Sequence, residues 1–176
     1  MKEIFNKNIL QYFENIDFIE DLKKKIEYEN NKDDVEENET LYLEFEKFLK
    51  NNYYLTHFMS FLIKSFNIEN ISFYNEINQL YQLVDKEEIK KELDEIIKKY
   101  LQKDCELELN LPETFINNVL TDYKKMEEIN EIDIHIFDPI LKEVKLMLFA
   151  SFNDFVITKE YSNLKETEKI ESFFVN

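Results

Sequence analysis

The chain has 176 residues, a net charge of −16 and no glycine, and these properties exclude several classes of protein. Hydrophobic residues make up 44% of the sequence and aromatic residues 15%, which is enough apolar material for a folded core and too much for a wholly disordered chain. Phosphate-cradling loops and dinucleotide folds usually need glycine, so both are disfavoured. The acidic charge also disfavours nucleic acid and anionic membrane surfaces as partners.

The cysteine count and the first residues predict where the protein resides. A single cysteine, Cys105, cannot form an internal disulfide, which is typical of a reducing cytosol. Residues 1–18 contain no long uncharged apolar run, so we expect neither a signal peptide nor a membrane span. These features predict a soluble cytoplasmic protein that does not insert into membranes.

The N-terminal part of the chain is predicted to be an extension. Residues 1–27 contain two short sets of apolar positions that fit amphipathic helices. Residues 28–40, YENNKDDVEENET, are acidic and have no periodic apolar stripe, so we interpret them as a mobile linker. Residues 1–40 are therefore assigned to a helical extension and an acidic linker.

From Leu41 onward, apolar residues recur at intervals of three and four, which is typical of buried helices. Breaks are expected near Asn51-Asn52 and over residues 67–70. The apolar stripes before residue 102 are Phe45, Phe48, Leu49; Leu55, Phe58, Met59, Leu62, Phe66; Ile71, Tyr74, Ile77, Tyr81, Val84; and Ile89, Leu93, Ile96, Ile97, Tyr100, Leu101.

The segment CELELNLPETF alternates like a strand but has no partner strand, so it is interpreted as an extended loop. Pro112 and Glu113 then favour the start of a helix, and its apolar face is Phe115, Ile116, Val119, Leu120 and Tyr123.

The pair Asp138-Pro139 predicts another helix start, with Asp138 as the N-cap. The helix is expected to run from Ile140 through Phe149 and to bend or break near Ala150-Ser151. Residues 165–176 are expected to form a C-terminal tail with a short helix. The predicted fold class is all-α, a multi-helix bundle.

Catalytic chemistry is not evident in the sequence. His57 and His135 have no cysteine or histidine at a metal-ligand spacing, and His57, between core positions, is interpreted as a structural histidine. No serine or cysteine nucleophile has a base nearby in sequence. The many carboxylates fit a solvated surface. We therefore predict a protein without cofactor or metal that is not itself an enzyme.

Three stretches carry a resemblance to a known family. The first, FMSFLIKSFNIENISFYNEI, contains the Phe61-Leu62 pair, Glu69-Asn70 and Phe73. The second, IIKKYLQKDCELELNLP, ends in an asparagine-leucine pair, and the third, FDPILKEVKLMLFASFNDFVITKEYSNL, contains Leu146-Met147. Residues 41–164 thereby resemble the regulator of G-protein signalling (RGS) family. Tyr74 departs from the pattern, because the family usually has tryptophan there.

The resemblance implies a helical bundle whose inter-helix loops contact the switch segments of a G-protein α subunit (Gα) in its GTP or transition-state form. It implies a GTPase activator that attenuates signalling, acts as a monomer and reaches the membrane through its partners. The positions that match contact residues, or lie beside them, are Phe66, Asn67, Glu69, Asn70, Asn110, Leu146, Ala150, Ser151 and Asp154.

Two of these positions depart from the family. Ala150 stands where the family usually has an aspartate that faces a switch threonine, and Asp154 stands where it usually has an arginine. A lost carboxylate acceptor costs about 1–3 kcal/mol when its donor stays unsatisfied. A reversed interface charge adds to this cost against an unadapted partner.

Other interpretations stay open at this point. Asn70 is also suited to be the N-cap of a helix that starts at Ile71, and Asn110 to satisfy its own loop. The two alternative functions are a non-catalytic Gα-binding scaffold and a helical interaction domain unrelated to G proteins.

Overall fold

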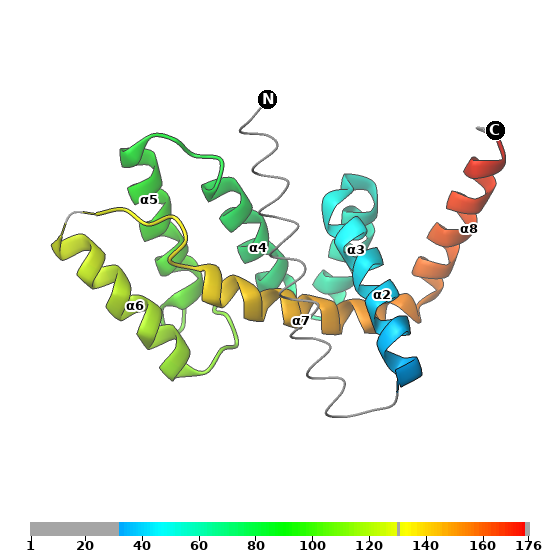
Figure 1. Cartoon of the computed structure of the whole chain (residues 1–176), viewed down its shortest axis with the longest axis horizontal. Helices are drawn as coiled ribbons and strands as arrows, with labels where there is room; N and C mark the ends of the chain where they lie inside the picture. Colours follow the sequence, from blue (N-terminus) through cyan, green and yellow to red (C-terminus); the bar gives the residue numbers. More distant parts are fainter. Residues whose placement is uncertain (1–31, 130, 175–176) are drawn as a thin grey trace. The chain divides into compact units, whose positions relative to one another are not determined.

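A computed structural model describes residues 32–129 and 131–174 (Figure 1). The helices are α2 (Lys32–Lys50), α3 (Asn52–Lys64), α4 (Ile68–Leu80), α5 (Lys86–Ile96), α6 (Glu113–Glu128), α7 (Asp138–Val156) and α8 (Lys159–Phe174), and a π-helical turn η1 (Ile97–Leu101) follows α5 directly. The described residues contain no strand. The predicted all-α fold class is therefore confirmed for this part of the chain.

The chain divides into two compact units, residues 1–51 and residues 52–176. In the first unit, the linker predicted over residues 28–40 is wrong from Lys32 onward, because α2 begins there. Lys47 and Lys50 lie in the last turn of this helix, where their positive charges favour its negative end. Residues 28–31 and the helices expected within residues 1–27 lie outside the described residues.

The C-terminal half of α2 carries a buried face. Tyr42, Phe45 and Phe48 are fully buried. The Tyr42 hydroxyl donates a hydrogen bond of 2.8 Å to the carboxylate of Glu46, whose other oxygen lies 3.3 Å from the Lys50 ammonium group. The predicted break near Asn51-Asn52 is confirmed, because α2 ends at Lys50 and α3 begins at Asn52.

In the second unit, α4 runs antiparallel to α7 and packs against it (Figure 1). Polar contacts join the two helices at both ends. Asn67, just before α4, donates from Nδ2 to the Ser151 hydroxyl at 3.4 Å. Tyr81, just after α4, donates from its hydroxyl to the carboxylate of Asp138, the first residue of α7. These contacts set the register between α4 and α7.

A bend or break is predicted near Ala150-Ser151, and the helix does not break there, because α7 is continuous to Val156. The Ser151 hydroxyl donates a hydrogen bond of 3.1 Å to the Met147 carbonyl of the same helix. Phe152 and Phe155 extend the buried face beyond Ser151. The start also differs slightly, since Phe137 is the N-cap and Asp138 is already helical, but its carboxylate still lies at the positive end of the helix.

Most of the predicted core is buried, including all six positions of the stripe from Ile89 to Leu101. Two predicted members are wrong. Val84 is exposed because α4 ends at Leu80, four residues earlier. Phe66 is 90% exposed because the chain leaves α3 in a left-handed turn at this residue, with φ of 57°. The interruption expected over residues 67–70 accordingly lies at residues 65–67.

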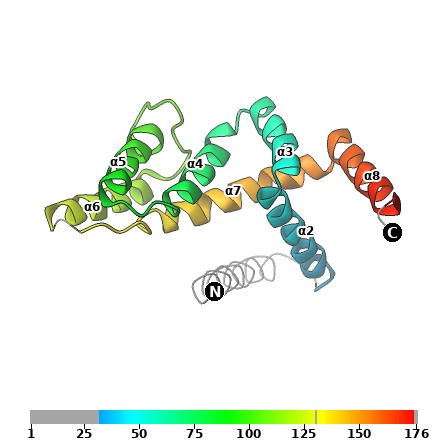
Figure 2. The ribbon, with the colours of Figure 1, turned by 90° about the horizontal axis from the view of Figure 1, so that it is seen from above.

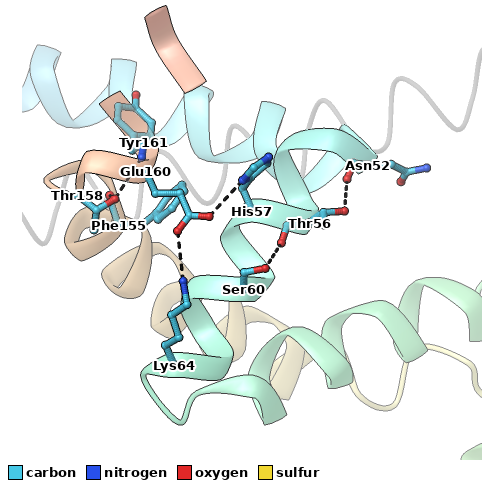
Figure 3. A network of polar contacts seen from close by, with 9 residues as sticks. All are labelled: Asn52, Thr56, His57, Ser60, Lys64, Phe155, Thr158, Glu160 and Tyr161. Carbon is cyan, nitrogen blue, oxygen red and sulfur yellow. Dashed lines mark hydrogen bonds and ion pairs between the residues drawn. The ribbon is translucent and has the colours of Figure 1, made fainter. Parts of the chain in front are cut away.

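The C-terminal helix is longer than the short helix predicted in the tail over residues 165–176. It begins at Lys159, because the Thr158 hydroxyl accepts a hydrogen bond of 3.2 Å from the Tyr161 amide and so caps the helix. Figure 3 shows how α8 is joined to α3: His57 Nδ1 lies 3.1 Å from Glu160 Oε1, and Lys64 Nζ lies 3.6 Å from Glu160 Oε2. Half-buried His57 therefore joins two helices, as expected of a structural histidine.

An aromatic cluster from α3, α7 and α8 underlies this contact. The Phe152 ring is fully buried and lies 5.5 Å from the Phe58 ring, 6.1 Å from the Phe155 ring and 6.2 Å from the Tyr161 ring, measured between centroids. Such edge-to-face and tilted ring pairs add to the free energy of area burial.

Substitution of Phe152 is expected to destabilise the fold strongly. Phe152→Ala should lower the free energy of unfolding by about 3–5 kcal/mol, because it leaves a cavity among three helices. The matched control is Ile157→Ala, at a position 85% exposed on the same chain segment, which should change stability by less than about 0.5 kcal/mol. Urea unfolding measures both, and equal effects of the two substitutions would contradict the packing described here.

Candidate functional site

Helix α3 ends in a Schellman motif, which forms the turn into α4. Phe66 occupies the position in this motif that glycine usually takes. The Asn67 amide donates to the Leu62 carbonyl at 2.9 Å, and the Phe66 amide donates to the Ile63 carbonyl at 3.3 Å. Phe66 occupies the left-handed region between them. A bulky residue costs about 1–2 kcal/mol in this conformation. The turn therefore holds an exposed aromatic ring at a local energetic cost.

Ile63 is a further candidate that sequence reasoning missed. It precedes Phe66 by three residues and is 58% exposed. The signal was present in the sequence, because Ile63 falls outside the buried stripe of Phe58 and Leu62 and must face away from it. Together Ile63 and Phe66 form an exposed apolar pair at the end of α3.

Glu69 and Asn70 lie in the first turn of α4, which begins at Ile68. The interpretation of Asn70 as an N-cap is therefore wrong, because it is the third residue of the helix. Its side chain is 97% buried (3% exposed) and donates from Nδ2 to Glu69 Oε1 at 3.1 Å. Its Oδ1 atom is buried and accepts no hydrogen bond within the described structure. An unsatisfied acceptor of this kind costs about 1–3 kcal/mol.

The segment predicted to be an extended loop connects η1 to α6, and this prediction is confirmed. Leu109 is buried and its amide donates to the Tyr100 carbonyl at 3.0 Å. The Leu111 amide donates to the Leu109 carbonyl at 2.9 Å, which closes a three-residue turn around Asn110. The exposed Asn110 thus stands at the tip of an anchored turn.

The third set of predicted positions lies on α7. Leu146, Ala150 and Asp154 are spaced four residues apart, so they follow one stripe of the helix. Ala150 and Asp154 are exposed, and Leu146 is half-buried. Ser151 is buried beside this stripe, at the hydrogen bond from Asn67.

Side-chain contacts relate the three segments to one another. The Asn67–Ser151 hydrogen bond joins the α3–α4 turn directly to α7. The loop that carries Asn110 is linked to α4 through Tyr100, whose ring packs edge-on against Phe73 at 5.3 Å. Figure 2 shows the α3–α4 turn and the loop before α6 on the same side of α7. No contact among the described residues joins Asn110 itself to Asn67 or Ser151.

The surroundings of these segments are acidic. Glu69, Glu106, Glu108 and Asp154 all lie on or beside them. Burial, with the charge of Glu108 as the second cause, raises the pKa of the Cys105 thiol in the same loop, so this cysteine is a weak nucleophile. Such a surface suits contacts with neutral or basic groups of a protein and disfavours direct binding of a phosphate.

No group of three or more histidine, cysteine, aspartate or glutamate side chains is placed to hold a metal ion in residues 32–129 and 131–174. Over the same ranges, no helix is both long and apolar enough to cross a membrane.

The fold and the site define the class of the protein: an all-helical module that presents turns between helices, with the exposed Phe66 ring and the exposed Asn110 amide, beside one long helix. Residues 44–164 match the family described as regulator of G protein signaling domain, and the chain belongs to this family. Domains of this family in general bind Gα and activate its GTPase without a catalytic site of their own. No curated protein matches the chain.

The strained turn yields a test that is independent of any partner. Phe66→Gly should raise the free energy of unfolding by about 1 kcal/mol or less, because glycine relieves the left-handed strain and the exposed ring contributes little to the core. Asn at this position, which tolerates the same conformation, should behave similarly. Thermal and urea unfolding measure the change, and a loss of more than about 1 kcal/mol in both variants would show that the Phe66 ring is packed.

Proposed function

We propose that residues 41–164 bind the switch segments of a Gα subunit in its GTP or transition-state form and accelerate GTP hydrolysis. The observation that carries this proposal is the Asn67–Ser151 hydrogen bond, because it joins two of the three segments in which the family resemblance predicts contacts. The site residues of the proposal are Phe66, Asn67, Glu69, Asn70, Asn110, Leu146, Ala150, Ser151 and Asp154.

The proposed mechanism requires no chemistry from this chain. A Gα subunit already has its catalytic arginine and a glutamine that orients the attacking water. A partner accelerates hydrolysis by holding these groups near their transition-state positions, which lowers the cost of ordering them. Asn110 suits this task because an exposed amide both donates and accepts without adding charge near phosphate.

The first turn suits a different part of the same task. Phe66 offers an exposed aromatic ring on a turn that is already ordered, so little further entropy is lost when it enters an apolar pocket. The buried Oδ1 atom of Asn70 lacks a donor in the isolated chain.

A second candidate function is a scaffold that binds Gα without activating it. Ala150 and Asp154 favour this candidate, because both are exposed on α7 and neither provides the group usual in the family. The two candidates differ in one respect only: a scaffold recognises the nucleotide state but leaves the rate of hydrolysis unchanged.

The first experiment separates the candidates. Purified chain is tested for binding to Gα loaded with GDP alone and with GDP plus aluminium fluoride, a mimic of the transferred phosphate. Activation predicts tighter binding to the mimic and faster single-turnover hydrolysis. State-dependent binding without faster hydrolysis selects the scaffold, and binding that ignores nucleotide state rejects both candidates.

Asn110→Ala tests the proposed role of the second loop. Loss of the amide should slow the activated hydrolysis by about 10- to 100-fold, which corresponds to about 1.4–2.8 kcal/mol of transition-state stabilisation. Asn118→Ala, an exposed asparagine on α6, serves as the matched control and should leave the rate unchanged. Full activity of Asn110→Ala would remove this residue from the site.

The two departures on α7 are tested together. In the double variant, Ala150→Asp introduces a carboxylate acceptor and Asp154→Arg introduces a positive charge on the exposed stripe of α7. The rate of GTP hydrolysis by a Gα that has the usual switch threonine should then rise by about 10-fold or more. A hydrogen bond from this threonine to the new carboxylate contributes about 1–3 kcal/mol. An unchanged rate in single-turnover assays would show that these residues do not limit recognition of that Gα.

The proposal also includes where and in what form the chain acts. We propose that it works as a cytoplasmic monomer and reaches the membrane through Gα or another partner. The net charge of −16 supports this, because it opposes direct adsorption to an anionic leaflet.

A further inference from the structure

An ion pair outside the proposed contact residues joins α4 to the π-helical turn. The Lys99 ammonium group donates to Glu76 Oε1, and both side chains are partly buried. Lys99 Nζ also lies 5.2 Å from the centroid of the Tyr100 ring. The pair is partly shielded from solvent, so it is screened less than an exposed surface pair.

The neighbourhood of Lys99 is otherwise acidic. Burial raises the pKa of Glu92, and the charges of Glu76 and Glu95 raise it further, whereas Lys91 and Lys99 lower it. Two carboxylates, Glu76 and Glu92, thus lie within electrostatic reach of each other and of Lys99. Removal of the Lys99 charge would take the positive partner from Glu76 and leave Lys91 as the remaining lysine that lowers the pKa of Glu92.

The backbone of the same turn holds the loop that carries Asn110. The Leu107 amide donates to the Lys99 carbonyl at 3.3 Å, and the Leu109 amide donates to the Tyr100 carbonyl at 3.0 Å. Carbonyls at the end of a helix have no partner inside it, so here the loop supplies their donors. The position of the loop is therefore set by the position of residues 99 and 100.

Both residues whose carbonyls hold the loop are attached to α4 by their side chains. Lys99 is paired with Glu76, and the Tyr100 ring packs against Phe73. Burial and the adjacent Glu76 carboxylate raise the pKa of the Tyr100 phenol, which also places Glu76 beside both residues. π-Helical turns are wider than α-helical ones and often occur at functional sites. Side-chain contacts thus join α4 to η1, and backbone hydrogen bonds join η1 to the loop whose tip is Asn110.

We propose that Glu76 and Lys99 are positioning residues that hold η1 on α4 and thereby fix the loop that presents Asn110. Neither residue belongs to the proposed contact surface. The effect on GTP hydrolysis rests on the proposed function, whereas the effect on the loop does not.

Amide hydrogen exchange tests the positioning role without any partner. Lys99→Met should speed exchange at the Leu107 and Leu109 amides by about 10-fold relative to amides in the middle of α7, because the loop loses its anchor and the core does not. Lys98→Met, at an exposed position of the same turn, is the control and should leave the two amides unchanged. Lys99→Arg keeps the charge and should restore protection.

Two results of this exchange experiment would overturn the proposal. The first is unchanged exchange at both loop amides in Lys99→Met. The second is an equal increase at all amides, which would mean that the pair only contributes to global stability.

The activity arm uses the same variants with a Gα in single-turnover assays. Lys99→Met should lower the maximal activated rate by about 10-fold, because Asn110 is held less precisely. The concentration for half-maximal effect should rise less, since the other contact segments are intact. A wild-type rate in Lys99→Met together with a loosened loop would overturn the link to Asn110. If the wild-type chain itself activates no Gα while Lys99→Met loosens the loop, the proposed function fails and the positioning role stands.

Discussion

The antiparallel packing of α4 against α7 is the constraint on which the rest of this structure depends. Asn67–Ser151 and Tyr81–Asp138 join the two helices at opposite ends, so neither helix can slide by a turn without losing a polar contact. Buried apolar faces fill the space between these ends, as in other helix pairs. The α3–α4 turn and the exposed stripe of α7 are next to each other because this register is unique.

Two residues in or beside the α3–α4 turn have local conformations or contacts that lower the stability of the fold. Phe66 adopts a left-handed conformation in a chain without glycine, and the Oδ1 atom of Asn70 is buried without a donor. Strained backbone conformations of this kind cluster at functional sites, where the surrounding structure maintains them. Both features occur in or beside the α3–α4 turn, at the N-terminal end of α4, where Asn67 bonds to Ser151.

Membership of the family and activity are separate questions for this chain. The family match covers residues 44–164, and buried apolar residues lie along the helices of this range. Ala150 and Asp154 are exposed on α7, and substitutions at exposed positions usually have little effect on stability. A fold is preserved by many buried contacts, whereas recognition depends on a few exposed groups. The frame can therefore persist while the choice of Gα, or activation itself, diverges.

The amino-acid sequence alone determined the all-α class, the helical stripes and the extended loop before Pro112, because periodicity and proline act over a few neighbouring residues. It placed Phe66 in the core and a bend or break near Ala150-Ser151, whereas Phe66 is exposed and α7 continues to Val156 without a break. Only the tertiary structure decided these points: a left-handed turn exposes Phe66, and the Ser151 hydroxyl bonds to its own helix and to Asn67. Exposure and long-range hydrogen bonds depend on which helices meet, and a local pattern carries no information about partners far away along the chain.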